Sequence, residues 1–479
     1  MNDQPATQGR GAIRWIVLGL MSLVIFSNYY LYDCFSTLKG TFQTELVADS
    51  EAWGWVRNSY SFPNVWVFMV LLGGILVDRF GIRKTGIVST AMCALGGIVT
   101  AYAVTDTFRN GGLGHGLVDN GLVNWLLPEF SSGVKLMMLG RLLFGLGAET
   151  QIVMLNKVLA KWFMGKELAL AFGLNLGLAR LGTALGMQVS PRIAEQYDFQ
   201  SALWVGALVM ISGLVLFLVY SVMDYQEDKR RGAASGAAKL ADEEKFRLSD
   251  IQTLLVNKTF ILITLLCATF YAVVFPFQDF LADLLTHKYG YEKVDAGDLT
   301  SMIPYAAAIC TIAFGALVDR KGLRATLMLG GSSILLISLL CFGLTNITPL
   351  VLIPLAGIAF SLVPAAMWPA VALIVDEKKL GTAYGLMAWV QNLLCWVMPP
   401  LAGWTLDKSN PGVKPENIEA GTGVYNYTSV ILMFAALAAV AVFIAVSLRL
   451  SERGKSYSGL ELPSAEAAKY NKDKREAAK

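Results

Sequence analysis

Charged residues are scarce in this sequence, and histidine is almost absent. Only 16% of its 479 residues are charged, whereas an ordinary soluble protein carries about 25%. A soluble chain of this length would need two or three domains with implausibly apolar surfaces. The two histidines, His115 and His287, fall between the long apolar segments. No carboxylate–histidine set, metal-ligand spacing or phosphate-binding glycine loop is present, so we expect neither an enzyme nor a bound metal or cofactor.

Long apolar segments fill most of the chain, which is 55% hydrophobic with a mean hydropathy of +0.53. Twelve of them have about the ~20 residues that a membrane-spanning helix needs. The sequence therefore predicts an all-α membrane protein with twelve helices. The predicted spans are residues 13–36, 53–77, 86–105, 136–160, 167–190, 201–223, 258–281, 298–318, 325–345, 348–375, 381–404 and 426–449.

Polar segments divide the chain into two halves of six predicted helices. A polar N-terminal tail, 1–12, precedes the first half, 13–223. A charged segment, 224–257, has the composition of a solvated linker and leads to the second half, 258–450. The tail 451–479 is polar and is expected to be mostly disordered.

Lysine and arginine set the predicted orientation. Of 39 such residues, only Arg141 and Arg180 fall well inside a predicted span. Most of the others flank the termini and the loops after every second helix, which are cytosolic if both termini are cytosolic. Short polar ends favour an inner (plasma) membrane protein.

A ten-residue motif occurs twice. Residues 74–83 (GILVDRFGIR) recur as 315–324 (GALVDRKGLR), at an offset of 241. Later the offset falls to 212, where 170–174 (LAFGL) matches 382–386 (TAYGL). The difference matches the length of the long loop 106–134. The two halves are thus a tandem repeat with one insertion, which predicts a pseudo-two-fold relation between them.

The repeated motif suggests a conformational role. Its glycine permits close helix approach, and its aspartate can pair with arginines or with a helix N-terminus across the seam between the halves. The alternative is a charged turn that only fixes topology. The candidate gating residues are Asp78, Arg79, Arg83, Asp319, Arg320 and Arg324.

The motif at 74–83 resembles the loop signature of the major facilitator superfamily. Residues 141–147 (RLLFGLG) are similar to the arginine–glycine motif of its fourth helix, whereas the glycine–proline motif of its drug antiporters is missing from 182–186. The resemblance implies a transporter that works by alternating access.

Further stretches resemble one branch of that superfamily, the dipeptide transporters of animal lysosomes and their prokaryotic relatives. The resemblance implies passive, uniport-like movement of dipeptides, with a glutamate on the fourth helix and an arginine on the fifth in the site. These map onto Glu149 and Arg180. The long loop and Cys34 depart from the branch. The stretches are Tyr32-Asp33, 61–65 (SFPNV), 145–149, 162–168, 179–182, 271–277 (YAVVFPF), 367–369, 380–385 and Gln391-Asn392.

Geometry alone also singles out Glu149 and Arg180. Each lies near the middle of its predicted helix, where a charge is costly. At ~1.5 Å per residue their depths differ by about 5 Å. An anion for the ammonium group and an arginine for the carboxylate suit a dipeptide zwitterion. The alternative is a structural ion pair that locks the two helices.

Five further residues are candidates for the substrate site. Arg141 lines the cavity or pairs with Asp33. Tyrosines at matching positions of the two halves suit a pocket for peptide backbone, although tyrosine also favours membrane interfaces. The predicted set is Arg141, Tyr30, Tyr271, Trp368 and Asn392. Asp279 and Asp283, one turn apart near the outer end of the seventh helix, are expected to form a solvated helix end rather than an outer gate.

The sequence therefore predicts a monomeric transporter of dipeptides in the lipid bilayer that binds no nucleic acid. Its first rival is a proton-coupled carrier of a small organic anion, with Glu149 as the proton site. The second is a transporter-like receptor that moves no solute, for which the long loop is the only support.

Overall fold

The computed structural model describes residues 5–120, 122–163, 167–230, 248–376, 379–419, 422–453 and 457–477. Within these ranges the chain is helical and contains no strand. Clustering of the backbone divides it into two compact units. Unit 1 comprises Met1–Phe35 and Phe62–Lys239, and unit 2 comprises Ser36–Ser61 and Leu240–Lys479.

Each predicted span falls mostly on helix, the second on three separate short helices. Unit 1 contains α1 (Pro5–Asp33), α4 (Phe62–Trp66), α5 (Met69–Phe80), α6 (Ile82–Tyr102), α7 (Asp106–Arg109), α8 (His115–Asp119), α9 (Leu122–Leu126), α10 (Ser132–Phe163), α11 (Leu168–Gln196) and α12 (Phe199–Arg230). Unit 2 contains α2 (Lys39–Leu46), α3 (Ser50–Asn58), α13 (Leu248–Val256), α14 (Lys258–Tyr289), α15 (Lys293–Lys321), α16 (Arg324–Leu344), α17 (Pro349–Ile374), α18 (Leu380–Ser409), α19 (Pro415–Glu419), α20 (Thr428–Ser451) and α21 (Ser464–Ala477).

The long helices meet the requirements for crossing a membrane. Among the described residues, nine are long and apolar enough, and α15, bent by 40° between Thr311 and Ala313, would make a tenth. The structure is thus that of an all-α membrane protein. The count of twelve spans stays a prediction.

The second predicted span, 53–77, is not one continuous helix. It is divided into α3, α4 and α5, with turns at 59–61 and at 67–68. Pro63 has no N–H to donate to the preceding turn, and Phe68 has φ +57°, a left-handed conformation that no α-helix contains. These breaks place α3 in unit 2 and leave α4 and α5 in unit 1.

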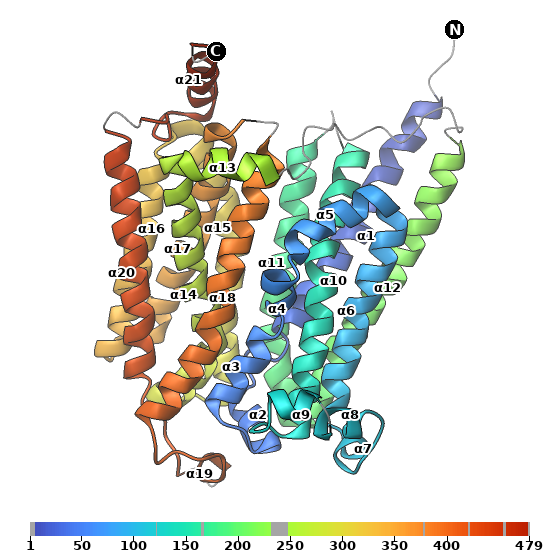
Figure 1. Ribbon diagram of the computed structural model, residues 1–479, viewed down its shortest axis with the longest axis vertical. Helices are drawn as coiled ribbons and strands as arrows, with labels where there is room; N and C mark the ends of the chain where they lie inside the picture. The colour runs from blue at the N-terminus through green and yellow to red at the C-terminus, as the bar shows by residue number, and fades with distance from the viewer. Residues whose placement is uncertain are drawn as a thin grey trace. The chain divides into compact units, whose positions relative to one another are not determined.

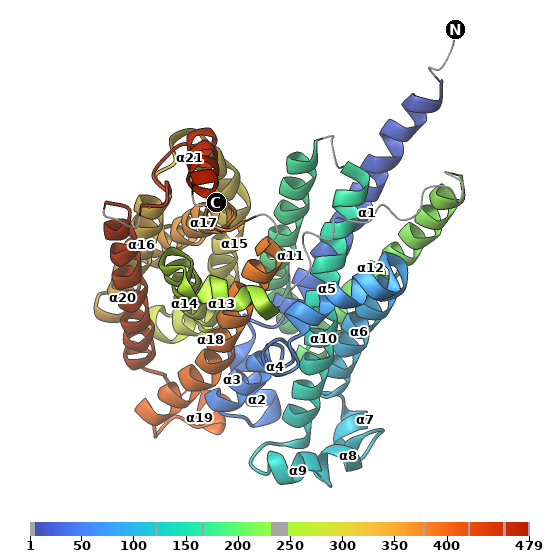
Figure 2. The same cartoon turned by 45° about the horizontal axis from the view of Figure 1, so that its top comes forward.

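Unit 1 is built on two long helix pairs. α10 packs along α6 and α1 packs along α11, while α12 lies against both α1 and α6 (Figure 1). Their shared core contains Met21, Leu155 and Phe217, all fully buried. The short helices α7, α8 and α9 gather where α10 begins (Figure 2). Trp125 and Leu126 of α9 are exposed.

Unit 2 includes a segment from far upstream. Residues Ser36–Ser61 pack here, with α3 running along α18, although the sequence predicts them in the N-terminal half. Two glycines make the close approach possible. A Cβ on Gly54 would lie 2.3 Å from the Pro399 carbonyl oxygen, and one on Gly403 would lie 2.0 Å from that of Ser50. The backbones of α3 and α18 are therefore in direct contact.

The tail beyond α20 is more ordered than its composition predicts. Residues 457–463 run back toward α16, and the chain ends in α21, which projects from the end of the unit 2 bundle (Figure 1). The predicted linker, 224–257, begins as the last turns of α12 and ends as α13. Its central part, 231–247, lies outside the described residues.

Candidate functional site

Glu149 lies in the middle of α10, on the side that α4 approaches. Its side chain is half-buried, and the Asn64 amide donates to its carboxylate over 3.4 Å. Asn64 reaches it because the second predicted span is broken on both sides of α4. A carboxylate has two acceptor oxygens and can bind more than one donor.

Arg180 lies on α11 and is also half-buried. The Tyr29 hydroxyl, from α1, is within electrostatic range of both Arg180 and Glu149. The structure thus brings both charges to one region of unit 1, around a tyrosine of the first helix. Neither side chain is fully exposed and neither is sealed inside the core, as a site for a small ionic solute requires.

A buried polar network lies beside Glu149. The Asn28 amide donates to Gln151, and Gln151 donates to Thr90 over 3.0 Å. Sequence reasoning missed these residues, although amides in the middle of apolar helices could have revealed them. Because a buried polar group without a partner is costly, the network helps to fix how α1, α6 and α10 pack against one another.

Arg141 is buried, with 1% of its surface exposed. Its guanidinium donates to the carbonyls of Leu31 and Tyr32 over 3.3 Å each and lies 4.7 Å from the centre of the Phe35 ring. A cation on the last carbonyls of α1 satisfies groups that the helix itself leaves unpaired. These contacts hold the end of α1 on α10, so contact of Arg141 with substrate stays a prediction.

Tyr30 is buried between α1 and α11. Its ring packs near Phe26, with 6.2 Å between centroids. A Cβ on Gly186 would lie 2.9 Å from the Tyr30 carbonyl oxygen, so the two helices are in close contact here. The side chain stands in the helix interface, and its role toward substrate is untested.

In unit 2 the structure brings together two predicted residues, Tyr271 of α14 and Trp368 of α17. The Trp368 indole donates to the Tyr271 hydroxyl over 3.2 Å. The Tyr384 hydroxyl of α18 donates to the Trp368 carbonyl over 3.1 Å, and Phe275 stacks on Tyr271 at 5.1 Å. Three helices thus contribute to one aromatic cluster with polar edges, which suits peptide groups and varied side chains.

Asn392, on α18, is buried and bonds to its own helix. Its amide nitrogen donates to the Ala388 carbonyl over 3.0 Å. The neighbouring Gln391 accepts from the Cys267 thiol over 3.4 Å.

The first copy of the repeated motif ends in a charged cluster within unit 1. Arg83 lies 3.3 Å from the Asp228 carboxylate, and Lys161 donates to Asp224 over 2.7 Å. Arg79 is exposed and lies over the Phe80 ring. Asp78 lies in α5, and its side chain is outside the described part of the structure.

The second copy differs in its partners. Asp319 accepts a hydrogen bond from Ser464 of the C-terminal tail, and Arg324 is buried beneath that tail. Arg320 is exposed. The gating role of both copies stays a prediction.

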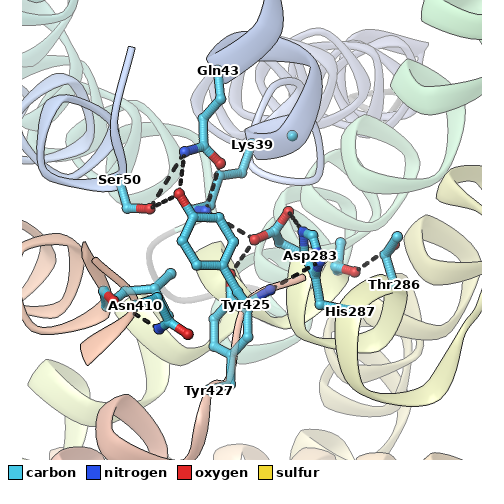
Figure 3. Close-up of polar contacts among 12 residues, drawn as sticks. Lys39, Gln43, Ser50, Asp283, Thr286, His287, Asn410, Tyr425 and Tyr427 are labelled. Atoms are coloured by element: carbon cyan, nitrogen blue, oxygen red, sulfur yellow. Dashed lines mark hydrogen bonds and ion pairs between the residues drawn. The ribbon is translucent and has the colours of Figure 1, made fainter. Parts of the chain in front are cut away.

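A second polar cluster lies at the other end of unit 2 (Figure 3). Lys39 of α2 forms an ion pair with Asp283 of α14, with 2.8 Å between Nζ and Oδ2, and donates to Gln43 over 2.8 Å. Lys39 also lies 4.5 Å from the centre of the Tyr425 ring. Only 1% of Lys39 and 7% of Asp283 is exposed. The predicted solvated helix end is wrong here, because α2 covers Asp283 and supplies its counter-ion.

Aromatic and histidine side chains complete the shell around Asp283. The Tyr427 hydroxyl donates to its carboxylate. Burial raises the pKa of Tyr425 above its ordinary value, so its hydroxyl keeps its proton, and it accepts from the Gln43 amide over 2.9 Å. The Tyr425 N–H donates to His287 Nδ1 over 3.3 Å, while His287 Nε2 lies 3.6 Å from Asp283.

Asp279 is paired in the same way one turn earlier. Arg57 of α3 lies 2.5 Å from its carboxylate, and 4% of each residue is exposed. Sequence reasoning missed Lys39 and Arg57 because each is more than 200 residues from its partner and nothing in the local pattern joins them. Together the two ion pairs fasten the segment Ser36–Ser61 to α14.

The architecture and the buried ionic groups are those of a polytopic membrane transporter. The family model of the Major Facilitator Superfamily matches residues 21–353 and 279–472. The chain belongs to this superfamily, whose members are transporters and not enzymes.

Several transporters of known name are similar to this chain over most of its length. The chain is 30% identical over 413 residues to the human lysosomal dipeptide transporter MFSD1, covering 83% of this chain and 81% of the human protein, and mouse MFSD1 gives the same values. It is 22% identical to the hexuronate transporter of Bacillus subtilis, covering 80% and 85% of the two chains.

Solved structures share the fold at low identity. The nucleoside transporter NupG superposes with a TM-score of 0.64 at 14% identity over 90% of this chain and 99% of the other. A bacterial homologue of the lysosomal transporter Spinster gives 0.66 at 14% identity over 92% and 97%. At this identity the likeness establishes the fold alone.

Proposed function

We propose that the chain transports dipeptides by alternating access, as a uniporter. The observation that carries the proposal is the pair of opposite charges, Glu149 and Arg180, in one region of unit 1. Both belong to stretches that resemble the dipeptide branch. The 30% identity to MFSD1 over most of both chains supports the same substrate class.

The charges suit both ends of a dipeptide. Arg180 binds the carboxylate in two-point fashion, and Glu149 accepts hydrogen bonds from the ammonium group. Both side chains are partly desolvated, which strengthens these interactions relative to water. Tyr271 and Trp368, whose polar edges already meet, are the proposed contacts for the peptide group, with Asn392, Tyr30 and Arg141 as further candidates.

Alternating access needs polar contacts that form in one state and break in another. The pairs Lys39–Asp283 and Arg57–Asp279 are contacts of that type. They attach a segment that is covalently joined to unit 1 at both ends, yet packs in unit 2. We infer that the segment Ser36–Ser61 separates from α14 and α18 when the transporter opens its substrate site on the side of the membrane where this segment lies.

The charge pattern supports an orientation. The protein is a multi-pass membrane protein, and we propose the inner (plasma) membrane with both termini in the cytoplasm. The lysine and arginine bias of alternate loops supports the cytoplasmic position of the termini.

Uptake of a labelled dipeptide into proteoliposomes tests the proposal. Uptake is expected to saturate and to be lost in Arg180→Ala. Arg192→Ala, an exposed arginine on the same helix, is the matched control and is expected to keep it. The assignment fails if free amino acids or organic anions compete better than dipeptides.

The relative that transports hexuronate, a sugar acid, favours the first rival, a proton-coupled carrier of organic anions. That rival predicts uphill uptake of an anion driven by a pH gradient, with coupling lost in Glu149→Gln. Dipeptide uptake that is unaffected by the pH gradient would exclude the proton-coupled carrier. Substrate binding without flux would instead indicate a receptor.

A further inference from the structure

The C-terminal tail docks on the second copy of the repeated motif. After α20 the chain turns back, and residues 457–464 run across the junction of α15 and α16 before α21 begins. We call residues 457–464 the strap. The hydrogen bonds described below join it to other residues of unit 2.

The strap caps the N-terminus of α16. The first N–H groups of a helix have no partner inside the helix. Here the N–H of Leu323 donates to the Glu461 carbonyl over 3.2 Å and that of Arg324 to the Leu460 carbonyl over 3.0 Å. The Glu461 carboxylate accepts from the Thr326 N–H over 3.0 Å and from its hydroxyl over 2.9 Å. An acidic group at a helix N-terminus also complements the helix dipole.

The strap also forms hydrogen bonds with two charged side chains of the motif. The Arg324 guanidinium donates to the Leu462 carbonyl over 2.9 Å and to the Ser464 hydroxyl over 2.6 Å. Ser464 in turn donates to Asp319 over 2.8 Å. Arg324 is consequently 1% exposed.

The other edge of the strap is held by the end of α20. The Glu452 carboxylate accepts from the N–H groups of Ser458 and Leu460, over 3.0 and 2.9 Å. The Ser458 hydroxyl shares a hydrogen bond of 2.9 Å with Thr259. The strap is therefore bound from two sides by specific hydrogen bonds. Those to Glu452 and Thr259 are buried.

The first copy of the motif has no such cover among the described residues. Its matching arginine, Arg83, keeps 36% of its side chain exposed and lies near Asp224 and Asp228. The matching glycines of the two copies also differ in how closely other residues surround them. A Cβ on Gly322 would lie 2.2 Å from the Leu462 carbonyl oxygen, whereas one on Gly81 would meet nothing within 4 Å.

We propose that the strap is a built-in restraint on the conformational cycle: it holds Asp319 and Arg324 within unit 2 and frees them for gating contacts only when it lifts. Arg324 is buried and its two terminal nitrogens donate to the strap, so those nitrogens cannot at the same time bind a partner elsewhere. The inference rests on the proposed alternation between two states, but it requires no particular substrate.

Docking of the strap is tested by hydrogen exchange on the full chain in nanodiscs. Gly322→Ala is expected to push the strap away and to speed exchange of the amides in 457–462 by at least about tenfold. Gly81→Ala also places alanine at a positive φ (+84° against +70°) but without the clash, and it is the control variant. Glu461→Gln, which keeps size and loses charge, is expected to act in the same direction more weakly. Equal exchange in Gly322→Ala and Gly81→Ala would overturn the docking.

The restraint itself is tested by spin labels at Lys84→Cys and Val256→Cys, two exposed positions in units 1 and 2. Without substrate, removal of residues 457–479 is expected to shift population from one distance peak to another. The same truncation is expected to have no effect in an Asp319→Ala/Arg324→Ala background, where neither residue is left to be released. Unchanged distances after truncation, or an equal shift in both backgrounds, would refute the restraint. If the truncated chain does not fold, Gly322→Ala and Glu461→Gln replace it. Failure of dipeptide uptake leaves both readouts intact and so counts only against the proposed function.

Discussion

Replacing Lys39 with methionine is expected to loosen the segment Ser36–Ser61 from unit 2. Methionine, like lysine, has an unbranched side chain, but it lacks the charge that lies 2.8 Å from Asp283. Asp283 stays buried and keeps Tyr427 as a donor, so the site holds a carboxylate without its strongest partner. Removing one partner of a buried ion pair costs about 3–5 kcal/mol. Since about 1.4 kcal/mol is a factor of ten in an equilibrium, local opening becomes roughly 100-fold or more frequent.

Hydrogen exchange of the amides in α2 and α3 measures this opening directly. In Lys39→Met it is expected to accelerate by about that factor, while exchange in α10 and α11 of unit 1 is unchanged. Lys293→Met is the matched control. Lys293 also reaches this segment, over 3.4 Å to the Thr41 hydroxyl, but in an exposed position, where a polar contact contributes little.

A double variant identifies the cause. In Lys39→Met/Asp283→Asn no unpaired charge remains and Tyr427 keeps an acceptor, so much of the protection is expected to return. Exchange that is unchanged in Lys39→Met, or that rises further in the double variant, would refute the reasoning that the buried ion pair holds the segment.

Two further predictions concern packing. Gly54→Ala places a methyl group 2.3 Å from the Pro399 carbonyl oxygen, which is expected to destabilise the fold by about 1–3 kcal/mol. Its melting temperature is expected to be lower than that of Gly74→Ala, where nothing lies within 4 Å of the added methyl group. Equal melting temperatures of the two variants would contradict the close contact of α3 and α18. Arg141→Gln removes the cation from the carbonyls at the end of α1 and is expected to lower the melting temperature. A raised KM at unchanged melting temperature would instead place Arg141 in the substrate site.

The positions of the helices could be predicted closely from the sequence. In lipid each segment must satisfy its backbone internally, so apolar length and flanking charge define the helices within a few residues. The predicted span 258–281 begins where α14 begins but ends eight residues before Tyr289, and 325–345 differs from α16 by one residue at each end. The repeat predicted the superfamily for the same reason, because its residues are local in sequence.

Features that depend on distant contacts escaped prediction. Asp283 looks like a solvated helix end until Lys39, 244 residues away, covers it. The break in the second span depends on Pro63 and on the left-handed Phe68, and it moves α3 into unit 2. The tail has a disordered composition, yet Glu452 and Arg324 supply the partners that order it. In each case the missing information is the identity of a partner, which hydropathy does not contain.

Binding of end-capped dipeptides tests the central claim most directly. A hydrogen bond to a charged group contributes about 1.5–3 kcal/mol, so amidating the carboxylate is expected to weaken binding to the wild type about 10- to 100-fold. In Arg180→Gln, amidation of the carboxylate is expected to weaken binding no further. Acetylating the amine is expected to show the same pattern with Glu149→Gln. If either cap weakens binding equally in the wild type and in its matched variant, Glu149 and Arg180 do not hold the two ends of the substrate.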